Sequence, residues 1–241
     1  LIVAHHPIIF KGLKKLTGQN YVERTIIKAI KNDIAIYAIH TNLDHVHRGV
    51  NKKIADQLGL ISQRVLAPKK NTLCKLVTFV PLEKTADVLE VLYKAGAGQI
   101  GNYKNCSFQV TGTGTFLPTD TANPHIGQSG KPEEVRENRI EVIFPKPLIS
   151  AVVEALKKEH PYEEVAYYIS RLENENEQVG AGMIGYLPTA MEPKVFLERL
   201  KLVMKAECVR YTSVIEGPIK KVAVCGGSGS FLLSKAIESG A

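Results

Sequence analysis

The sequence predicts an α/β core that is interrupted by a ferredoxin-like α+β insert, and three observations support this fold class. Short apolar strands alternate with helical patterns over the first 60 residues, which is typical of a parallel α/β unit. The middle of the chain has the order strand, helix, strand, strand, helix, strand, as in ferredoxin-like units. A helix, an apolar strand and a Gly-rich turn then resume the first pattern. We therefore expect core segments at 1–72 and 187–241 and an insert at 73–186.

The first core segment is expected to contain two strands and two helices. Apolar runs at 1–7 and 34–40 predict the strands, and because these runs are continuous we expect both faces of the strands to be covered. Helical patterns occupy 21–33 and 52–60, and Asn20 is placed to cap the first of these helices.

A polar stretch begins at residue 67 and marks the transition to the insert. The elements of the insert are expected as strands at 75–81, 106–118, 138–145 and 164–173 and as helices at 83–96 and 148–160. The insert is expected to end near 185–193, which contains two prolines. Core elements then return as a helix at 195–207, a strand at 220–225 and a helix at 231–238.

The composition indicates a folded, water-soluble protein of one large or two modest domains. The chain has 241 residues, of which 44% are hydrophobic and 23% are charged, as is usual for globular proteins. The longest apolar runs fall far short of the roughly 20 residues that cross a bilayer, so no membrane association is expected. Four cysteines, Cys74, Cys106, Cys208 and Cys225, form no CxxC pair, which favours a reducing, cytoplasmic location.

The chain ends and the charge lead to two further expectations. The chain begins with Leu1 inside an apolar run and stops shortly after an amphipathic helix, so we expect it to be a fragment of a longer protein. The net charge of +7 is spread over helices of mixed sign rather than gathered in one basic stripe. This distribution argues against a nucleic-acid partner, which would need such a stripe.

Candidate metal ligands follow the first predicted strand. His5 and His6 stand at its carboxyl end, the edge at which ligands of open α/β sheets bind. Adjacent side chains of an extended segment point in opposite directions. The two imidazoles therefore serve two different metal ions, or one packs inward while the other faces solvent.

The second predicted strand brings further donors to the same edge. It ends at His40, and Asp44 follows in the next turn. Histidine nitrogen and carboxylate oxygen together suit zinc, iron or manganese rather than calcium. His45 and His47 lie in a polar turn and are interpreted as solvated histidines. Three donors are too few for a dinuclear site, so more ligands are needed from elsewhere.

The Gly-rich turn at 225–230 has two interpretations. Backbone amides at the start of the following helix can receive an anion, or glycine serves only the backbone angles of a tight connection. The turn matches neither a P-loop nor a GxGxxG motif.

A second polar motif lies between a helix and a strand of the insert. It contains His160, Tyr162, Glu163 and Glu164. Carboxylates beside a histidine can act in acid–base catalysis, while the alternative is a solvated turn shaped by the intervening proline. His125 lies in a loop with no partner in view and is interpreted as a surface residue.

Three motifs of the outer segments are specific enough to indicate a family. They are HHPIIFKGLKKL at 5–16, IYAIHTNLDHVHRGVNKKIADQLGL at 36–60 and VAVCGGSGSFL at 222–232. Together they resemble the Nif-three-like family, whose members are also labelled GTP cyclohydrolase I type 2 homologues or dinuclear metal centre proteins. In the middle segment, GTGTFLP and HPYEEVAY resemble the PII-like or CutA-like domain that longer bacterial members carry inserted in the core.

The resemblance implies a toroidal homohexamer with two divalent metal ions in each subunit. By match to the family motif, His5 and His6 each ligate one metal ion, Asp44 supplies a carboxylate ligand, and His40 sits beside the site. The family's remaining ligands come from a motif beyond the Gly-rich turn that this sequence does not contain, so we expect an incomplete site.

The resemblance also implies a metal-dependent hydrolase that acts on a nucleotide, with opening of the purine ring of GTP as the suggested reaction. This chain alone is then expected to be inactive. The alternative is a regulatory or scaffolding protein in which the metals are structural and the insert binds a small ligand or a partner.

Overall fold

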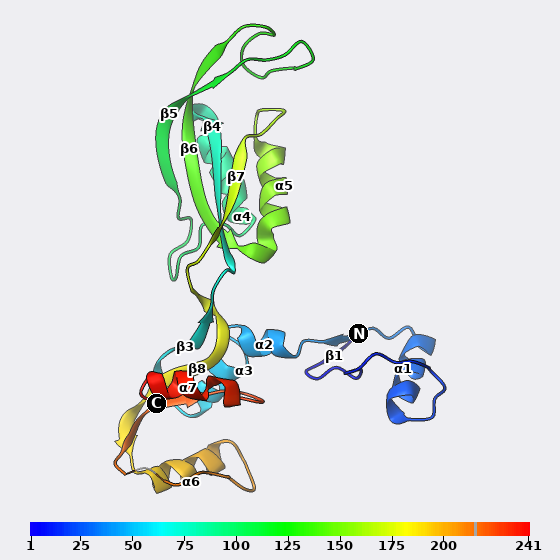
Figure 1. The fold of residues 1–241 in the computed structure, drawn as a ribbon, viewed down its shortest axis with the longest axis vertical. Coiled ribbons are helices and arrows are strands. Elements are labelled where there is room, and N and C mark those ends of the chain that lie inside the picture. The colour runs from blue at the N-terminus through cyan, green and yellow to red at the C-terminus, as the bar shows by residue number, and fades with distance from the viewer. Residues whose placement is uncertain (215) are drawn as a thin grey trace. The chain divides into compact units, whose positions relative to one another are not determined.

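The computed structural model describes residues 1–214 and 216–241 (Figure 1). The chain divides into two compact units. Unit 1 comprises Leu1–Pro68 and Glu177–Ala241, and unit 2 comprises Lys69–Asn176. Unit 2 thus occupies the place of the predicted insert, but it starts four residues earlier and ends ten residues earlier than the expected 73–186.

Unit 2 has the strand and helix order that the sequence predicted. Its main elements are β4 (Leu73–Pro81), α4 (Thr85–Lys94), β5 (Phe108–Phe116), β6 (Glu133–Pro145), α5 (Ile149–Glu159) and β7 (Tyr167–Leu172). The short 3-10 helices η1 (Leu82–Lys84) and η2 (Lys146–Leu148) precede α4 and α5. The sheet has the order β5-β6-β4-β7 with antiparallel neighbours, which is the ferredoxin-like arrangement.

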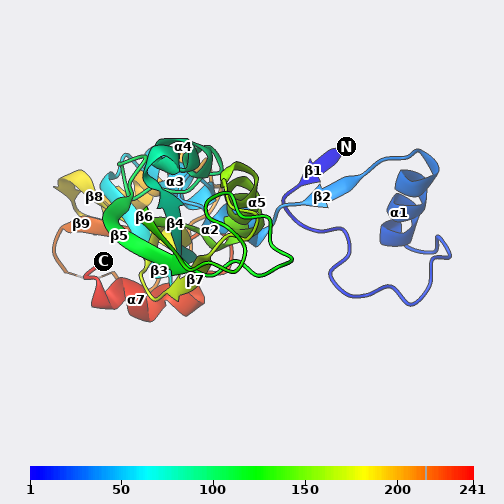
Figure 2. The ribbon, with the colours of Figure 1, turned by 90° about the horizontal axis from the view of Figure 1, so that it is seen from above.

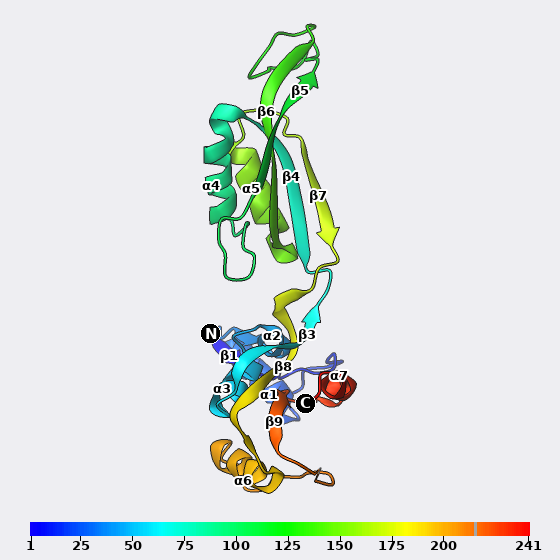
Figure 3. The same cartoon turned by 90° about the vertical axis from the view of Figure 1, so that its left-hand side faces the viewer.

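One face of this sheet carries the core of unit 2. Both α4 and α5 cover that face (Figure 3). Because side chains alternate along a strand, every second residue of β4 points toward the helices. The buried cluster contains Cys74, Leu76, Val80, Val88, Leu89, Leu92, Ala97, Ile140, Val142, Phe144, Val152 and Leu156. The other face of the sheet has no helix from unit 2 packed against it.

Unit 1 contains a two-stranded and a three-stranded sheet. The first consists of β1 (Ile2–Ala4) and β2 (Ile36–Ala38), and the second has the order β3 (Ile61–Lys69), β8 (Asn176–Met191) and β9 (Ile219–Val224). The helices are α1 (Tyr21–Lys31), α2 (Thr41–His45), α3 (Val50–Gln57), α6 (Pro193–Val203) and α7 (Leu233–Glu238), with the 3-10 helix η3 (Ser230–Leu232) before α7.

The pair β1 and β2 is parallel, as the sequence predicted (Figure 2). The expectation that both faces of these strands are covered is wrong for this structure. Val3 is 63% exposed and Tyr37 is 52% exposed. The sheet has only two strands, so no layer of helices encloses it among the described residues.

Two strands of the second sheet were not predicted. Strand β3 was not predicted because 61–69 contains polar residues and a proline. The expected insert boundary at 185–193 lies largely inside β8, which ends at Met191. The last strand, β9, pairs antiparallel with β8 instead of continuing a parallel sheet. Because β8 starts at Asn176 and belongs to this sheet of unit 1, unit 2 ends at 176 rather than at 186.

None of the described helices combines the length and the apolar character needed to cross a bilayer.

Candidate functional site

The candidate site lies where β1 and β2 end. Parallel pairing continues for two residues beyond the strands, since Ile39 N donates to Ala4 O at 2.9 Å and His40 N donates to His5 O at 2.8 Å. These bonds place His40 beside the two histidines that follow β1. The predicted convergence of the two strand ends is therefore present in the structure.

Three imidazole rings gather at this edge. The ring centroids of His5 and His6 are 4.7 Å apart, and those of His40 lie 5.7 Å from His5 and 5.5 Å from His6. His40 has a φ of 40°, a conformation that costs energy for a residue with a Cβ. Such strain is concentrated at functional sites in proteins.

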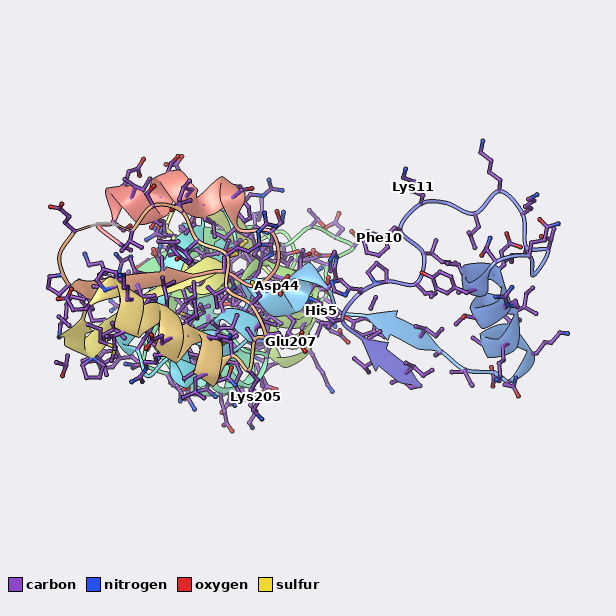
Figure 4. The ribbon with its side chains drawn as sticks, turned by 90° about the horizontal axis from the view of Figure 1, so that it is seen from below. His5, Phe10, Lys11, Asp44, Lys205 and Glu207 are labelled. Atoms are coloured by element: carbon purple, nitrogen blue, oxygen red, sulfur yellow. The ribbon has the colours of Figure 1, made fainter. Side chains whose placement is uncertain are left out.

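Asp44 completes the group from the side of α2. Its carboxylate oxygen Oδ1 is 3.9 Å from Nε2 of His5, and Figure 4 shows the two side chains next to each other. Its position is fixed through the backbone, because the Asn51 side chain donates to the carbonyl oxygen of Asp44 at 2.8 Å. Burial raises the pKa of the Cys225 thiol, and the negative charge of Asp44 raises it further.

The Gly-rich turn is tied to the same group. The amide of Gly226 donates to Asn51 Oδ1 at 2.7 Å, so Asn51 bridges the turn and the backbone of Asp44. Only 2% of Asn51 is exposed. One amide of the turn is thus engaged by the protein itself, which supports the structural interpretation of the turn. No pattern in the sequence indicates this role of Asn51, because an asparagine in a helix is ordinarily solvated.

The chemistry of these imidazole and carboxylate donors suits a divalent transition metal. Among residues 1–214 and 216–241, no three His, Cys, Asp or Glu side chains are arranged to hold a metal ion. The imidazole and carboxylate groups nevertheless have the chemistry that zinc, iron and manganese prefer. His45 ends α2, and His47 is held through its backbone N–H, which donates to Gln178 O at 2.9 Å.

A family model described as Duf34/NIF3 (NGG1p interacting factor 3) matches residues 1–241. The chain belongs to the DUF34/NIF3 family. The resemblance inferred from the histidine and Gly-rich motifs is thereby confirmed.

Relatives within the DUF34/NIF3 family are named GTP cyclohydrolase 1 type 2 homologues. One from Halalkalibacterium halodurans is 46% identical over 242 residues, and one from Bacillus subtilis is 43% identical over 242 residues. Each match covers 100% of this chain and 65% of the relative. The chain therefore spans about two thirds of the length of these curated relatives.

A solved structure supports the fold. The Bacillus cereus protein described as related to NIF3 has a TM-score of 0.85 and 42% identity, covering 100% of this chain and 64% of that one. A Staphylococcus aureus protein matches with a TM-score of 0.66 and 27% identity, covering 100% and 62%. The predicted mixed α/β fold of the NIF3 type is thus confirmed.

The polar motif of the insert lies in unit 2, beside a cavity of about 770 Å³. Tyr162, Glu163 and the loop residue His125 all line this cavity. The ring of His160 lies 5.0 Å from that of Tyr162, and His160 is only 6% exposed. Burial lowers the pKa of His160, which favours the neutral ring.

The cavity also contains a carboxylate that the sequence analysis missed. Glu137 is 8% exposed, and its Oε1 accepts a hydrogen bond from the hydroxyl of Tyr162 at 2.9 Å. Its position in β6, amid alternating charged residues, resembles that of an ordinary solvent-facing residue. Periodicity alone could not distinguish it.

Proposed function

We propose that this chain forms part of the divalent-metal site of a metal-dependent hydrolase that acts on a nucleotide. The observation that carries the proposal is the convergence of His5, His6, His40 and Asp44 at the carboxyl ends of two parallel strands. The relatives' name, GTP cyclohydrolase 1 type 2 homolog, suggests GTP as the nucleotide.

In this proposal His5, His6 and Asp44 hold a divalent ion of the zinc, iron or manganese type. A divalent ion bound there would lower the pKa of a bound water and supply hydroxide for hydrolysis. His40, held by its backbone bond to His5, orients the neighbouring imidazoles. Asn51 keeps Asp44 in place through the backbone of α2, since groups behind metal ligands fix the ligands' orientation.

Self-association is part of the proposal. The exposed faces of β1 and β2 carry Ile2, Val3 and Tyr37, and contiguous exposed apolar surface commonly marks an interface. Burial of this surface against other copies fits the hexamer that the family resemblance implies. The expected assembly and the cytoplasmic location both stay predictions.

The experiment is a metal-binding measurement on this chain with zinc, iron(II) and manganese(II), analysed by elemental analysis after equilibrium dialysis. Because the ligand set of this chain is incomplete, we expect weak but measurable binding by the unaltered chain and at least a tenfold further loss of affinity in Asp44→Ala and in His6→Ala. His125→Ala and Asp87→Ala, which alter the same residue types in unit 2, serve as matched controls. Equal binding by all four variants, or no binding by the unaltered chain, would contradict the proposal.

A second candidate function is ligand binding by unit 2 in a regulatory protein. The cavity lined by Tyr162, Glu163 and His125 favours it. The two candidates differ in their dependence on metal, because ligand binding in unit 2 does not involve the histidines that follow β1.

A further inference from the structure

The cavity of unit 2 lies on the sheet face that α4 and α5 leave uncovered. Its lining comes from β5, from the loop that follows β5, from the turn at 162–164, and from residues of β4, β6 and β7. The loop and the turn are joined, since the amide of Asn123 donates to Glu163 Oε1 at 2.8 Å. A volume of about 770 Å³ falls within the range of small-molecule sites.

A buried and only partly satisfied carboxylate faces this space. Glu137 accepts the Tyr162 hydroxyl on Oε1, whereas no donor among the described residues hydrogen-bonds its Oε2. A Cβ at Gly114 would collide with Glu137 Oε2, so the absence of a side chain there gives the carboxylate its place over β5. Among the described residues the buried side-chain polar atoms without a partner do not include Oε2, so this oxygen is open to the cavity and can accept an N–H from a ligand.

Contacts with His160 hold Tyr162 in the position from which its hydroxyl donates to Glu137. Its backbone N–H donates to His160 Nδ1 at 3.1 Å. Because Nδ1 accepts this bond, the ring proton of the neutral imidazole lies on Nε2, which is 2.8 Å from the carbonyl oxygen of Phe79. Burial and the bond to Glu137 raise the pKa of Tyr162, so Tyr162 remains a proton donor to Glu137.

The charges of the lining disfavour a phosphate group. Three carboxylates, Glu137, Glu163 and Glu164, face one guanidinium, that of Arg139. Arg139 is already paired, since its Nη2 lies 2.7 Å from Glu141 Oε1. An anionic ligand would therefore meet net negative charge, while N–H donors or a positive charge would be favoured.

The aromatic side chains that line the cavity favour a planar ligand. Phe79 and Tyr168 contact each other edge to face at a centroid distance of 6.0 Å, and Tyr162 lies 6.2 Å from Phe116 and 6.3 Å from His125. Aromatic side chains around a cavity stack on planar ligands.

We propose that this cavity binds a planar nitrogen heterocycle of nucleobase size, as the nucleoside without phosphate, through N–H groups of the ring or of its amino substituent that donate to Glu137. The inference gives a ligand class to the second candidate function and rests on it. It does not depend on metal bound by His5, His6 or Asp44.

The test is a calorimetric titration of the full chain with guanosine, adenosine and GTP in the presence of a chelator. We expect at least one nucleoside to bind and GTP to bind at least tenfold more weakly than the better nucleoside. The chelator separates this outcome from the metal proposal, because loss of the metal site leaves nucleoside binding intact. No binding of either nucleoside, or GTP binding as tightly as the better nucleoside, would overturn the inference.

Variants locate the site. Glu137→Gln should weaken nucleoside binding at least tenfold, and Tyr162→Phe should weaken it less. Tyr93→Phe removes a hydroxyl that bonds to Ser107 outside the cavity and serves as the matched control. If Glu137→Gln disturbs folding, Val110→Trp provides a second test, because Val110 lines the cavity at a 49% exposed position and a larger ring should block it. Unchanged binding in Val110→Trp would contradict the location.

Discussion

The two candidate sites differ in how well the sheet beneath each of them is packed. The cavity of unit 2 lies on a four-stranded sheet whose other face packs against two helices, with Leu76, Ile140 and Leu156 fully buried. The histidine cluster of unit 1 lies on a two-stranded sheet with exposed apolar side chains such as Val3. Burial of apolar surface therefore maintains one site, while backbone hydrogen bonds and single contacts maintain the other.

This difference predicts which substitutions should alter each site and which should unfold the unit that carries it. At the histidine cluster, the polar side chain of Asn51 links Asp44 to Gly226, so individual substitutions should change the site without unfolding unit 2. At the cavity, the sheet should tolerate changes on its open face but not on its helix-covered face.

The largest expected effect comes from the core of unit 2. Phe144 is 1% exposed, and Phe144→Ala should destabilise unit 2 by about 3–5 kcal/mol, because it removes buried surface and leaves a cavity. Tyr37→Ala, at a 52% exposed position of β2, should cost less than about 1 kcal/mol. Hydrogen exchange resolved by residue is the appropriate measurement, since two units need not unfold in one step. Equal losses in both variants would remove the contrast between the regions.

A smaller but more local effect is expected at Gly49, between α2 and α3. An added Cβ would overlap the carbonyl oxygen of Leu43, and such overpacking costs about 1–3 kcal/mol. Gly49→Ala should therefore displace α2 and reduce metal binding through Asp44. Gly112→Ala is the matched control, because a Cβ there has no atom within 4 Å. Metal titration and thermal unfolding of both variants test this, and equal behaviour would show that α2 does not position the site.

Helix α1 of unit 1 begins differently from the two helices α4 and α5 of unit 2. Asn20 caps α1 by accepting the amide of Glu23 at 2.9 Å, whereas α4 and α5 have no side-chain cap. Asn20→Ala should therefore fray α1 at a cost of about 1 kcal/mol. Lys84→Ala, at the corresponding position of α4, should leave that helix unchanged because its buried face anchors it. Exchange rates of the first-turn amides provide the measurement, and protection of α1 in Asn20→Ala would argue against the cap.

The same contrast explains what the sequence could predict. Long amphipathic helices such as α5 were predicted closely, since their apolar period reflects a core that they themselves help to form. The strand β8 was missed because its glycines make close backbone approaches that no periodicity reveals; a Cβ at Gly180 would overlap Ala67 O. The candidate metal ligands were found because they end two apolar runs. Glu137 and Asn51 were not, because their roles depend on partners 25 and 175 residues away.

The smallest expected effect is a difference in acid sensitivity between the regions. In unit 2, burial lowers the pKa of His160 from its usual 6.5, so the unfolded chain binds the proton more readily and stability falls as the pH drops below about 6.5. In unit 1, hydrogen bonds led by that of the Thr17 hydroxyl lower the pKa of Glu23 to about 2. Stability from Glu23 is therefore present above pH 4.5 and is lost only as the pH falls toward 2.

Exchange measurements between pH 7 and 5 should consequently show α5 loosening while α1 stays protected. His160→Gln should remove the response of α5, and His125→Gln, at an exposed position, should retain it. If α1 loosened first, or if His160→Gln kept the full response, burial of the imidazole would not be the cause. That result would also contradict the proposed support of the cavity by a buried His160. In that proposal His160 accepts the backbone N–H of Tyr162 and so holds Tyr162 beside Glu137.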